Sequence, residues 1–236
     1  MPQIKFTLRE YQENIDKTAK ERNTLVVLPT GLGKTKIAIG LAIERLVKFP
    51  DSKIIMCSPT KPLSNQIRTE FIESTNIEEN KIVLLTGAIS PKKRINLYHE
   101  ASIIVATPQT IQKDLENNRL NLETYSLLVI DEAHRSRLKF ANTIVVQRYL
   151  NQSKHPRILG LTASPGSTKE KIDEIRQNLS IESIEIRSSG DEDVKQYTQE
   201  KNVTFIEVEL PPSFLEISAL VSEIYKKKLK QYFKLQ

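Results

Sequence analysis

A short glycine-containing segment carries the residue types that bind phosphate groups. The apolar run Leu25–Leu28 leads into the sequence PTGLGKT, and a helix-like segment follows it. Glycines allow backbone N–H groups to close around phosphate oxygens, a lysine can reach the β- and γ-phosphates, and a threonine hydroxyl can ligate Mg²⁺. The N-terminus of the following helix adds a partial positive charge. We therefore expect a nucleoside triphosphate to be bound by Pro29, Thr30, Gly31, Leu32, Gly33, Lys34 and Thr35.

This segment departs from the general phosphate-loop pattern, because Leu28 stands where that pattern has its first glycine. An ordinary strand, turn and helix with a solvated lysine is the alternative interpretation. The apolar strand, the two glycines and the Lys34-Thr35 pair stand in register, and this favours the phosphate loop.

A pair of acidic residues follows another apolar run. Asp131 and Glu132 come directly after Leu127–Ile130. An aspartate at the end of a buried strand, downstream of a phosphate loop, is the expected Mg²⁺ partner of Thr35. Glu132 is placed to orient and deprotonate an attacking water, which makes it the candidate general base. Two acids in a surface turn would carry no function by themselves, but together with Lys34 they form the expected catalytic group.

His134 is the one histidine of three that we expect to be functional, because it lies beside these acids. The apolar run 157–161 ends in Thr162-Ala163-Ser164. The hydroxyls of Thr162 and Ser164 can bond across to His134 or Asp131, and such a link would transmit the state of the γ-phosphate to a facing lobe.

Apolar runs alternate with helical periodicity from the N-terminus to residue 187. After the strand that precedes the phosphate loop, further strands are expected at 53–58, 81–85, 102–106, 127–130, 157–161 and 183–186. Nearly continuous apolar strands separated by helices predict an α/β fold with a mostly parallel sheet covered by helices on both faces. Ligands of such sheets bind at the carboxyl ends of the strands, where the phosphate loop and the acids are found.

A helix is also expected ahead of the first strand, over residues 4–20. It contains the sequence Leu8-Arg9-x-Tyr11-Gln12, which resembles the adenine-binding Q motif of superfamily 2 helicases. The Gln12 amide offers one donor and one acceptor, which match the N6/N7 edge of adenine. A solvent-facing glutamine is the alternative.

Three other loops carry hydroxyls and glycines directly after strands: SPTKPLSNQ, TGAISPKKR and ATPQT. Each loop alone is typical of a strand-to-helix cap, and Thr107 in particular can cap the helix that Pro108 opens. Together they would place hydroxyls, free N–H groups and helix N-termini along one edge of the sheet, where they can hold phosphates independently of base sequence.

Composition limits the remaining choices. The net charge of +6 is compatible with a polyanionic partner, and the basic cluster Lys92-Lys93-Arg94 is either a solvated face or a nucleic-acid contact. The single cysteine, Cys57, excludes an internal disulfide framework and indicates a buried thiol in a reducing compartment. The sequence offers no apolar run of roughly 20 residues and no signal-peptide core. We expect an intracellular, cytoplasmic protein without a membrane partner, nucleoid-associated if prokaryotic.

The order of PTGLGKT, SPTKPL, TG, ATPQT, DEAH and TAS resembles the first RecA-like lobe of superfamily 2 helicases, which are P-loop NTPases. Within that superfamily, LPTGLGKT, VATPQT, DEAHR and LTASPG resemble the archaeal Hef helicase-nuclease and Fanconi anaemia group M translocase family. The resemblance covers Phe6 to about Arg187 and implies ATP-driven remodelling of forked or branched DNA, with ATP and Mg²⁺ as cofactors. It carries Gln12, Lys34, Thr35, Asp131, Glu132 and His134 onto the ATP site. It also implies that Thr162 and Ser164, with His134, couple this site to the facing lobe. The motifs of the family that face DNA match Thr60, Thr107 and the Thr86-Gly87 pair, which are the expected nucleic-acid contacts.

The resemblance also predicts the domain organisation. Residues 1–187 would form the ATP-binding lobe, and residues 188–236 an acidic linker, an alternating strand (VTFIEVEL) and the start of a helical insertion. A C-terminal helix docked on the lobe is an equal alternative for the last part. Motifs of a second lobe and of a nuclease are missing from these residues, so we expect a truncated chain whose ATP site is completed by a second lobe or a partner protein.

Three functions remain open at this stage. The first is the ATP-binding lobe of a DNA helicase or translocase in repair, with weak hydrolysis by itself. The second is an ATPase of the RNA-sensor or Dicer helicase type, stimulated by double-stranded RNA. The third is a non-catalytic ATP- or DNA-binding lobe that acts through a partner.

Overall fold

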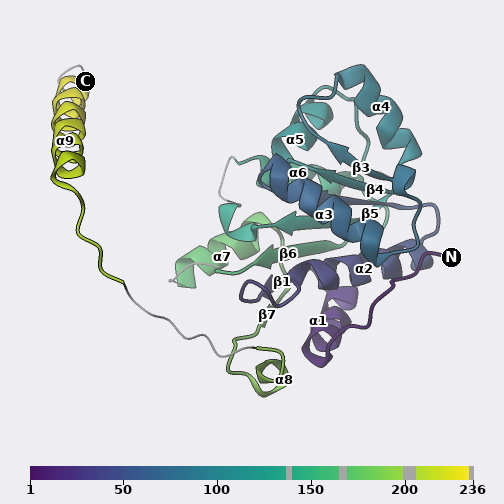
Figure 1. The fold of residues 1–236 in the computed structure, drawn as a ribbon. Coiled ribbons are helices and arrows are strands. Elements are labelled where there is room, and N and C mark those ends of the chain that lie inside the picture. Colours follow the sequence, from purple (N-terminus) through teal and green to yellow (C-terminus); the bar gives the residue numbers. More distant parts are fainter. Residues whose placement is uncertain (137–139, 165–168, 199–205, 234–236) are drawn as a thin grey trace. The chain divides into compact units, whose positions relative to one another are not determined.

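The computed structural model describes residues 1–136, 140–164, 169–198 and 206–233. The chain divides into two compact units, Met1–Thr198 and Gln199–Gln236 (Figure 1). The first unit contains the sheet and the helices that cover it. In the second unit the structure describes one long helix, α9 (Pro212–Phe233).

The first unit is built on a seven-stranded sheet in the order β3-β4-β2-β5-β6-β1-β7, and every strand pair is parallel. The expected parallel α/β fold is therefore confirmed. The strands are β1 (Thr24–Val27), β2 (Lys53–Cys57), β3 (Ile82–Leu85), β4 (Ile103–Ala106), β5 (Tyr125–Asp131), β6 (Ile158–Thr162) and β7 (Ser183–Ile186).

Helices cover both faces of this sheet (Figure 1). On β1, Val26 packs with apolar residues of α1, α2 and α3, whereas Leu25 and Val27 pack with residues of α5, α6 and α7. Each central strand thus buries both of its faces, which explains the continuous apolar runs. The helices of this unit are α1 (Glu10–Glu21), α2 (Lys34–Lys48), α3 (Lys61–Ser74), α4 (Pro91–Glu100), α5 (Pro108–Glu116), α6 (Ala141–Gln152), α7 (Lys169–Asn178) and α8 (Glu192–Lys195), with short 3₁₀ turns η1 (Glu79–Lys81) and η2 (Ala133–Arg135).

Because all the strands are parallel, their carboxyl ends meet at one edge of the sheet. The strand order places the ends of β5, β6 and β1 next to one another, and the ends of β3, β4 and β2 form the other half of that edge. Asp131 pairs with Leu161 and Val27 pairs with Thr162, so the acidic turn, the Thr162 segment and the phosphate loop are neighbours.

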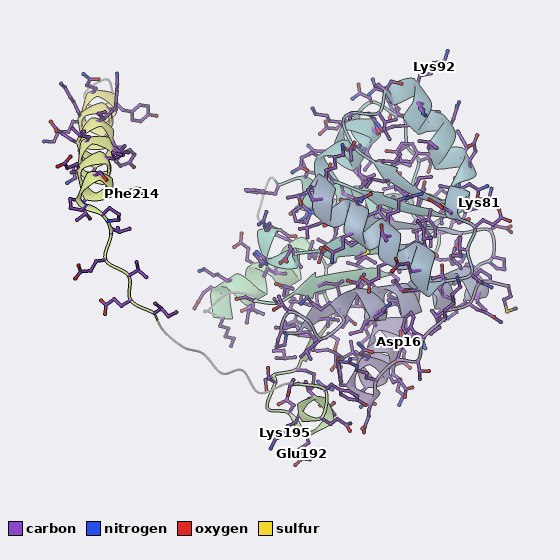
Figure 2. All side chains as sticks on the ribbon, viewed as in Figure 1. Asp16, Lys81, Lys92, Glu192, Lys195 and Phe214 are labelled. Carbon is purple, nitrogen blue, oxygen red and sulfur yellow. The ribbon has the colours of Figure 1, made fainter. Side chains whose placement is uncertain are left out.

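The segment after β7 differs from the acidic linker that its composition suggested. It contains the short helix α8, and Val194 on this helix is fully buried in the same apolar cluster as Tyr11 of α1. Ser188 to Thr198 therefore belong to the first unit. The side chains of Glu192 and Lys195 point away from the sheet, which accounts for the polar composition (Figure 2).

The predicted strand VTFIEVEL lies partly outside the described residues. Its described part, residues 206–210, does not form a strand. Alternation of apolar residues needs a neighbouring strand to become a sheet, and residues 206–210 pair with none of the described strands. The expected helix beyond Phe214 is present as α9, whose large apolar side chains are exposed.

Within the part of the chain that the structure describes, no helix combines the length and the apolarity needed to cross a bilayer.

Candidate nucleotide-binding site

The loop between β1 and α2 has the backbone of a phosphate-binding loop. Gly31 and Gly33 adopt positive φ values of 85° and 68°, a conformation that side chains other than glycine rarely tolerate. A Cβ atom at Gly33 would also lie 2.6 Å from Gln12 Nε2. Pro29, Thr30 and Leu32 complete the loop, and Lys34 begins α2 with Gly33 as the residue before it. The two glycines are therefore required by the geometry of this turn.

The Lys34 ammonium group bends back over the loop. Its Nζ donates hydrogen bonds to the carbonyl oxygens of Leu28, at 2.8 Å, and Pro29, at 3.2 Å. Burial lowers the pKa of Lys34, and the carboxylates of Glu132 and Asp131 oppose this shift. The Lys34 ammonium group thus lies over the loop. When a nucleotide binds, its phosphate oxygens would replace the two carbonyl oxygens as hydrogen-bond acceptors of Lys34.

Gln12 braces this loop. Its side chain is buried, its Oε1 accepts from the Arg9 backbone N–H at 2.9 Å, and its Nε2 donates to the carbonyls of Leu32 and Gly33 at 3.3 and 3.4 Å. Tyr11 supports the same loop, since its hydroxyl donates to the Leu32 carbonyl at 2.8 Å. The alternative of a solvent-facing glutamine is wrong. Adenine recognition by Gln12 stays a prediction, and the loop-bracing contacts were not anticipated.

Asp131 lies at the end of β5, and its carboxylate is oriented by a serine that the sequence did not single out. The fully buried Ser58, directly after β2, donates its hydroxyl to Asp131 Oδ2 at 3.1 Å. Burial and the neighbouring Glu132 raise the pKa of Asp131, and the Ser58 hydrogen bond opposes this. Only the pairing of β2 with β5 brings these two residues together, and that pairing was not assigned from the sequence.

Glu132 occupies the left-handed region, with φ 52° and ψ 49°, and it leads into the η2 turn that carries His134. His134 Nδ1 lies 3.2 Å from Glu132 Oε2 and 3.1 Å from Thr162 Oγ1. The Thr162 hydroxyl donates to the Ser164 carbonyl at 3.1 Å and accepts from the Ser164 N–H at 3.2 Å. With the Thr162 proton used in this way, His134 Nδ1 would be the donor in its contact with Thr162. The three predicted coupling residues are thus connected to the candidate base.

The oxygen-rich character of this edge suits Mg²⁺, a hard cation that prefers carboxylate, hydroxyl and phosphate oxygens. Asp131 and the half-buried Thr35 in the first turn of α2 are the candidate protein ligands. Among the described residues, no three His, Cys, Asp or Glu side chains gather closely enough to hold a metal alone. With two protein ligands, the other positions around an octahedral Mg²⁺ would be filled by nucleotide phosphates and water.

The four predicted nucleic-acid contacts lie on the other half of the same edge, after β3, β4 and β2. Thr60 precedes α3 and accepts weakly from the Leu63 N–H at 3.5 Å. Thr107 stands before α5 but makes no side-chain cap, because its hydroxyl bonds the Thr110 hydroxyl at 2.9 Å instead. Thr86 is nearly buried, and the space around Gly87 is open.

The basic cluster next to Gly87 is not a uniform charged face. Lys92 and Lys93 are exposed, and Lys92 extends outward from α4 (Figure 2). Arg94 is buried and donates to both carboxylate oxygens of Asp114 on α5, at 2.6 and 2.7 Å. Arg94 therefore stabilises the interior of the fold. Of the three residues in this cluster, Lys92 and Lys93 are the ones that can contact a partner.

A glycine loop with Lys-Thr at a helix start, together with a strand that ends in Asp131 and is followed by Glu132, defines a P-loop NTPase of the RecA-like type. The model of the family "DEAD/DEAH box helicase" matches residues 9–172. The chain belongs to this family.

Individual relatives agree with this assignment. A protein of Methanocaldococcus jannaschii, provisionally named an ATP-dependent RNA helicase, is 41% identical over 94% of this chain and 28% of its own length. The ATP-dependent DNA helicase fml1 of Schizosaccharomyces pombe is 37% identical over 99% of this chain and 28% of its own length.

Among solved structures, the Hef helicase domain of Pyrococcus furiosus superposes with a TM-score of 0.81 and 46% identity, covering 95% of this chain and 47% of that one. The predicted resemblance to the Hef and Fanconi anaemia group M family is confirmed. The chain spans about a quarter of the length of the two relatives above.

Proposed function

We propose that this chain is the N-terminal ATP-binding lobe of an ATP-dependent DNA helicase or translocase that acts on forked or branched DNA in repair. One observation carries the proposal. Lys34, Asp131 and Glu132 meet at one edge of a domain that is 46% identical to the Hef helicase domain over 95% of this chain. The name of the Schizosaccharomyces pombe relative supports DNA as the substrate.

ATP hydrolysis is the chemistry for which these residues are suited. The loop N–H groups and Lys34 would hold the phosphates, and Thr35 and Asp131 would hold Mg²⁺, which neutralises the charge that develops on the phosphates. Glu132 would accept the proton of the attacking water. Its contact with His134 would keep the carboxylate oriented toward the water and link it to Thr162.

DNA would bind along the neighbouring half of the edge. Thr60, Thr86, Gly87 and Thr107 follow the strands β2, β3 and β4, and the exposed Lys92 lies on the helix after Gly87. Hydroxyls, N–H groups and lysines at such positions contact the phosphate backbone and do not distinguish bases. The proposed preference for forks would then depend on other parts of the whole protein.

A second lobe, or a partner protein, would complete the ATP site. Arginines supplied from a facing domain accelerate related phosphate-loop enzymes by roughly 10³ to 10⁵. Residues 1–236 alone should therefore bind ATP and hydrolyse it slowly. Robust unwinding by this chain alone would contradict the proposal. A role in repair places the protein inside the cell, associated with the nucleoid in a prokaryote.

RNA is the alternative substrate, since the Methanocaldococcus jannaschii relative is named an RNA helicase. ATPase assays on a two-lobed protein decide between the two. Forked DNA should stimulate hydrolysis more than double-stranded RNA does, and the reverse order would favour the RNA-sensor type. A lobe that acts only through a partner would keep partner binding after Lys34→Ala and show no ATP-dependent function at all.

A further inference from the structure

The segment after β7 packs on α1, the helix whose residues Tyr11 and Gln12 bond the nucleotide loop. Val194 of α8 is buried with Tyr11, and Figure 1 shows α8 beside α1. Two polar contacts hold the elements on either side of this packing to β7: Arg187 Nε, directly after β7, donates to Asp193 Oδ2 of α8 at 3.1 Å, and the Thr18 hydroxyl of α1 donates to Glu185 Oε1 of β7 at 2.7 Å. This segment is therefore fixed against the helix that carries Gln12.

Tyr197 lies in this segment, and its ring contacts Arg9 and Tyr11, which are close to Gln12 in the chain. The Arg9 guanidinium carbon lies 4.7 Å from the centroid of the Tyr197 ring, and the Tyr11 ring centroid is 5.7 Å away. Tyr197 N–H donates to the Val194 carbonyl at 2.8 Å, so the helix sets the position of its backbone. Arg9, in turn, donates through its backbone to Gln12 and through Nη1 to the Tyr11 hydroxyl at 3.4 Å.

We propose that Tyr197 is a positioning residue for the base of the bound nucleotide. Its ring holds the exposed Arg9 guanidinium beside Gln12, and this inference rests on the proposed ATP binding. A guanidinium that stacks on one ring still offers its other face and its edge donors to a planar, polar ligand such as a purine. Tyr197 lies outside the residues matched by the family model, which end at residue 172.

Exposure distinguishes this role from simple packing. Val194 is fully buried and supplies the apolar anchor, whereas Tyr197 is 36% exposed and lies at the surface of the segment. The contacts of its ring with Arg9 and Tyr11 depend on the aromatic ring and not on the hydroxyl. Tyr197→Phe should therefore retain the function, and Tyr197→Ala should lose it without unfolding the domain.

The test compares ATP with inorganic tripolyphosphate, which has no base, as competitors for a fluorescent ATP analogue in the presence of Mg²⁺. The proteins are the 236-residue chain, Tyr197→Ala, Tyr197→Phe and Tyr225→Ala, a control on α9 in the second unit whose tyrosine is 64% exposed. Exposed cation–π contacts are worth enough to change affinity about two- to fivefold. Tyr197→Ala should weaken ATP by that factor and leave tripolyphosphate unchanged, and the other two variants should match wild type.

Other outcomes overturn the inference in distinguishable ways. Wild-type affinity of Tyr197→Ala for ATP shows that the base is not positioned by Tyr197, while the proposed function stands. Equal weakening of ATP and tripolyphosphate shows a structural effect on the loop. If the wild-type chain binds ATP no more tightly than tripolyphosphate, it makes no favourable contact with the base and the inference is wrong. If the wild-type chain binds neither ATP nor tripolyphosphate, the proposed function is refuted as well.

Discussion

Replacing Asp114 by asparagine should destabilise the first unit strongly. Asp114 is fully buried, and its carboxylate accepts from Arg94, from the Tyr98 hydroxyl at 2.8 Å and from Arg119 at 3.5 Å. Asparagine keeps the size of the side chain but leaves the buried Arg94 charge without its counter-ion. Removing one partner of a buried ion pair costs about 3–5 kcal/mol, and we expect the lower end because the amide oxygen still accepts one bond.

A loss of about 3 kcal/mol should lower the melting temperature by about 6–12 °C for a unit of this size. Thermal unfolding followed by circular dichroism measures this shift. Glu116→Gln is the matched control, because Glu116 is exposed on the same helix and accepts a single bond from Gln112. A melting temperature of Asp114→Asn within 1 °C of the control would refute the reasoning.

The pH dependence supplies a second check on the same pair. Burial alone would raise the pKa of Asp114, but the hydrogen bonds from Arg94 and Tyr98 outweigh it, so the pKa lies below the ordinary value of 3.8. A carboxyl with a depressed folded-state pKa stabilises the fold above its unfolded pKa and loses that contribution as the pH falls through the folded value. The difference in unfolding free energy between wild type and Asp114→Asn should therefore be constant from pH 8 to 5 and shrink below about pH 4.

Three further predictions concern the nucleotide site. Gly33→Ala should weaken ATP binding at least about tenfold, measured by calorimetry, because a Cβ would lie 2.6 Å from Gln12 Nε2 at a φ of 68°; affinity like that of wild type would contradict this loop geometry. Ser58→Ala should raise the Mg²⁺ concentration needed for half-maximal ATP binding by about three- to tenfold, because Asp131 loses the donor that orients it. The control is Ser64→Ala, which should have no effect, because Ser64 is a buried serine that bonds the Thr60 carbonyl instead. Glu132→Gln should bind ATP normally and slow its hydrolysis by about 10² to 10⁴ in a two-lobed protein, and unchanged turnover would exclude it as the base.

The sheet and its motifs were predictable from the sequence because their signals are local. Each central strand is a short apolar run that buries both faces, and the motifs lie at or just after the strand ends, as PTGLGKT does after β1 and Asp131 does in β5. All strands of a parallel sheet end at the same edge, so a motif that comes just after a strand must lie at that edge. The contacts among His134, Thr162 and Ser164 were predictable for the same reason, and their role in coupling stays a prediction.

The missed features depend on partners that are distant in sequence. Arg94 looks like one member of a basic cluster until α5 brings Asp114 against it. Ser58 gains its role only because β2 pairs with β5. Tyr197 lies in a polar segment whose single buried anchor, Val194, carries no periodic signal. Pairing between elements decides such contacts, and the composition of either element alone does not contain that information.

Mg²⁺-dependent ATP binding by the 236-residue chain tests the central claim most directly. Calorimetry should show one ATP bound per chain, lost on chelation of Mg²⁺ and weakened at least about tenfold by Lys34→Ala, because the Lys34 ammonium group reaches over the loop from the start of α2. Lys36→Ala is the matched control, since Lys36 bonds Ser74 and pairs with Glu70 away from the loop, and it should bind as wild type does. The absence of ATP binding by the folded wild-type chain, or equal affinity of the Lys34→Ala variant, would contradict the account.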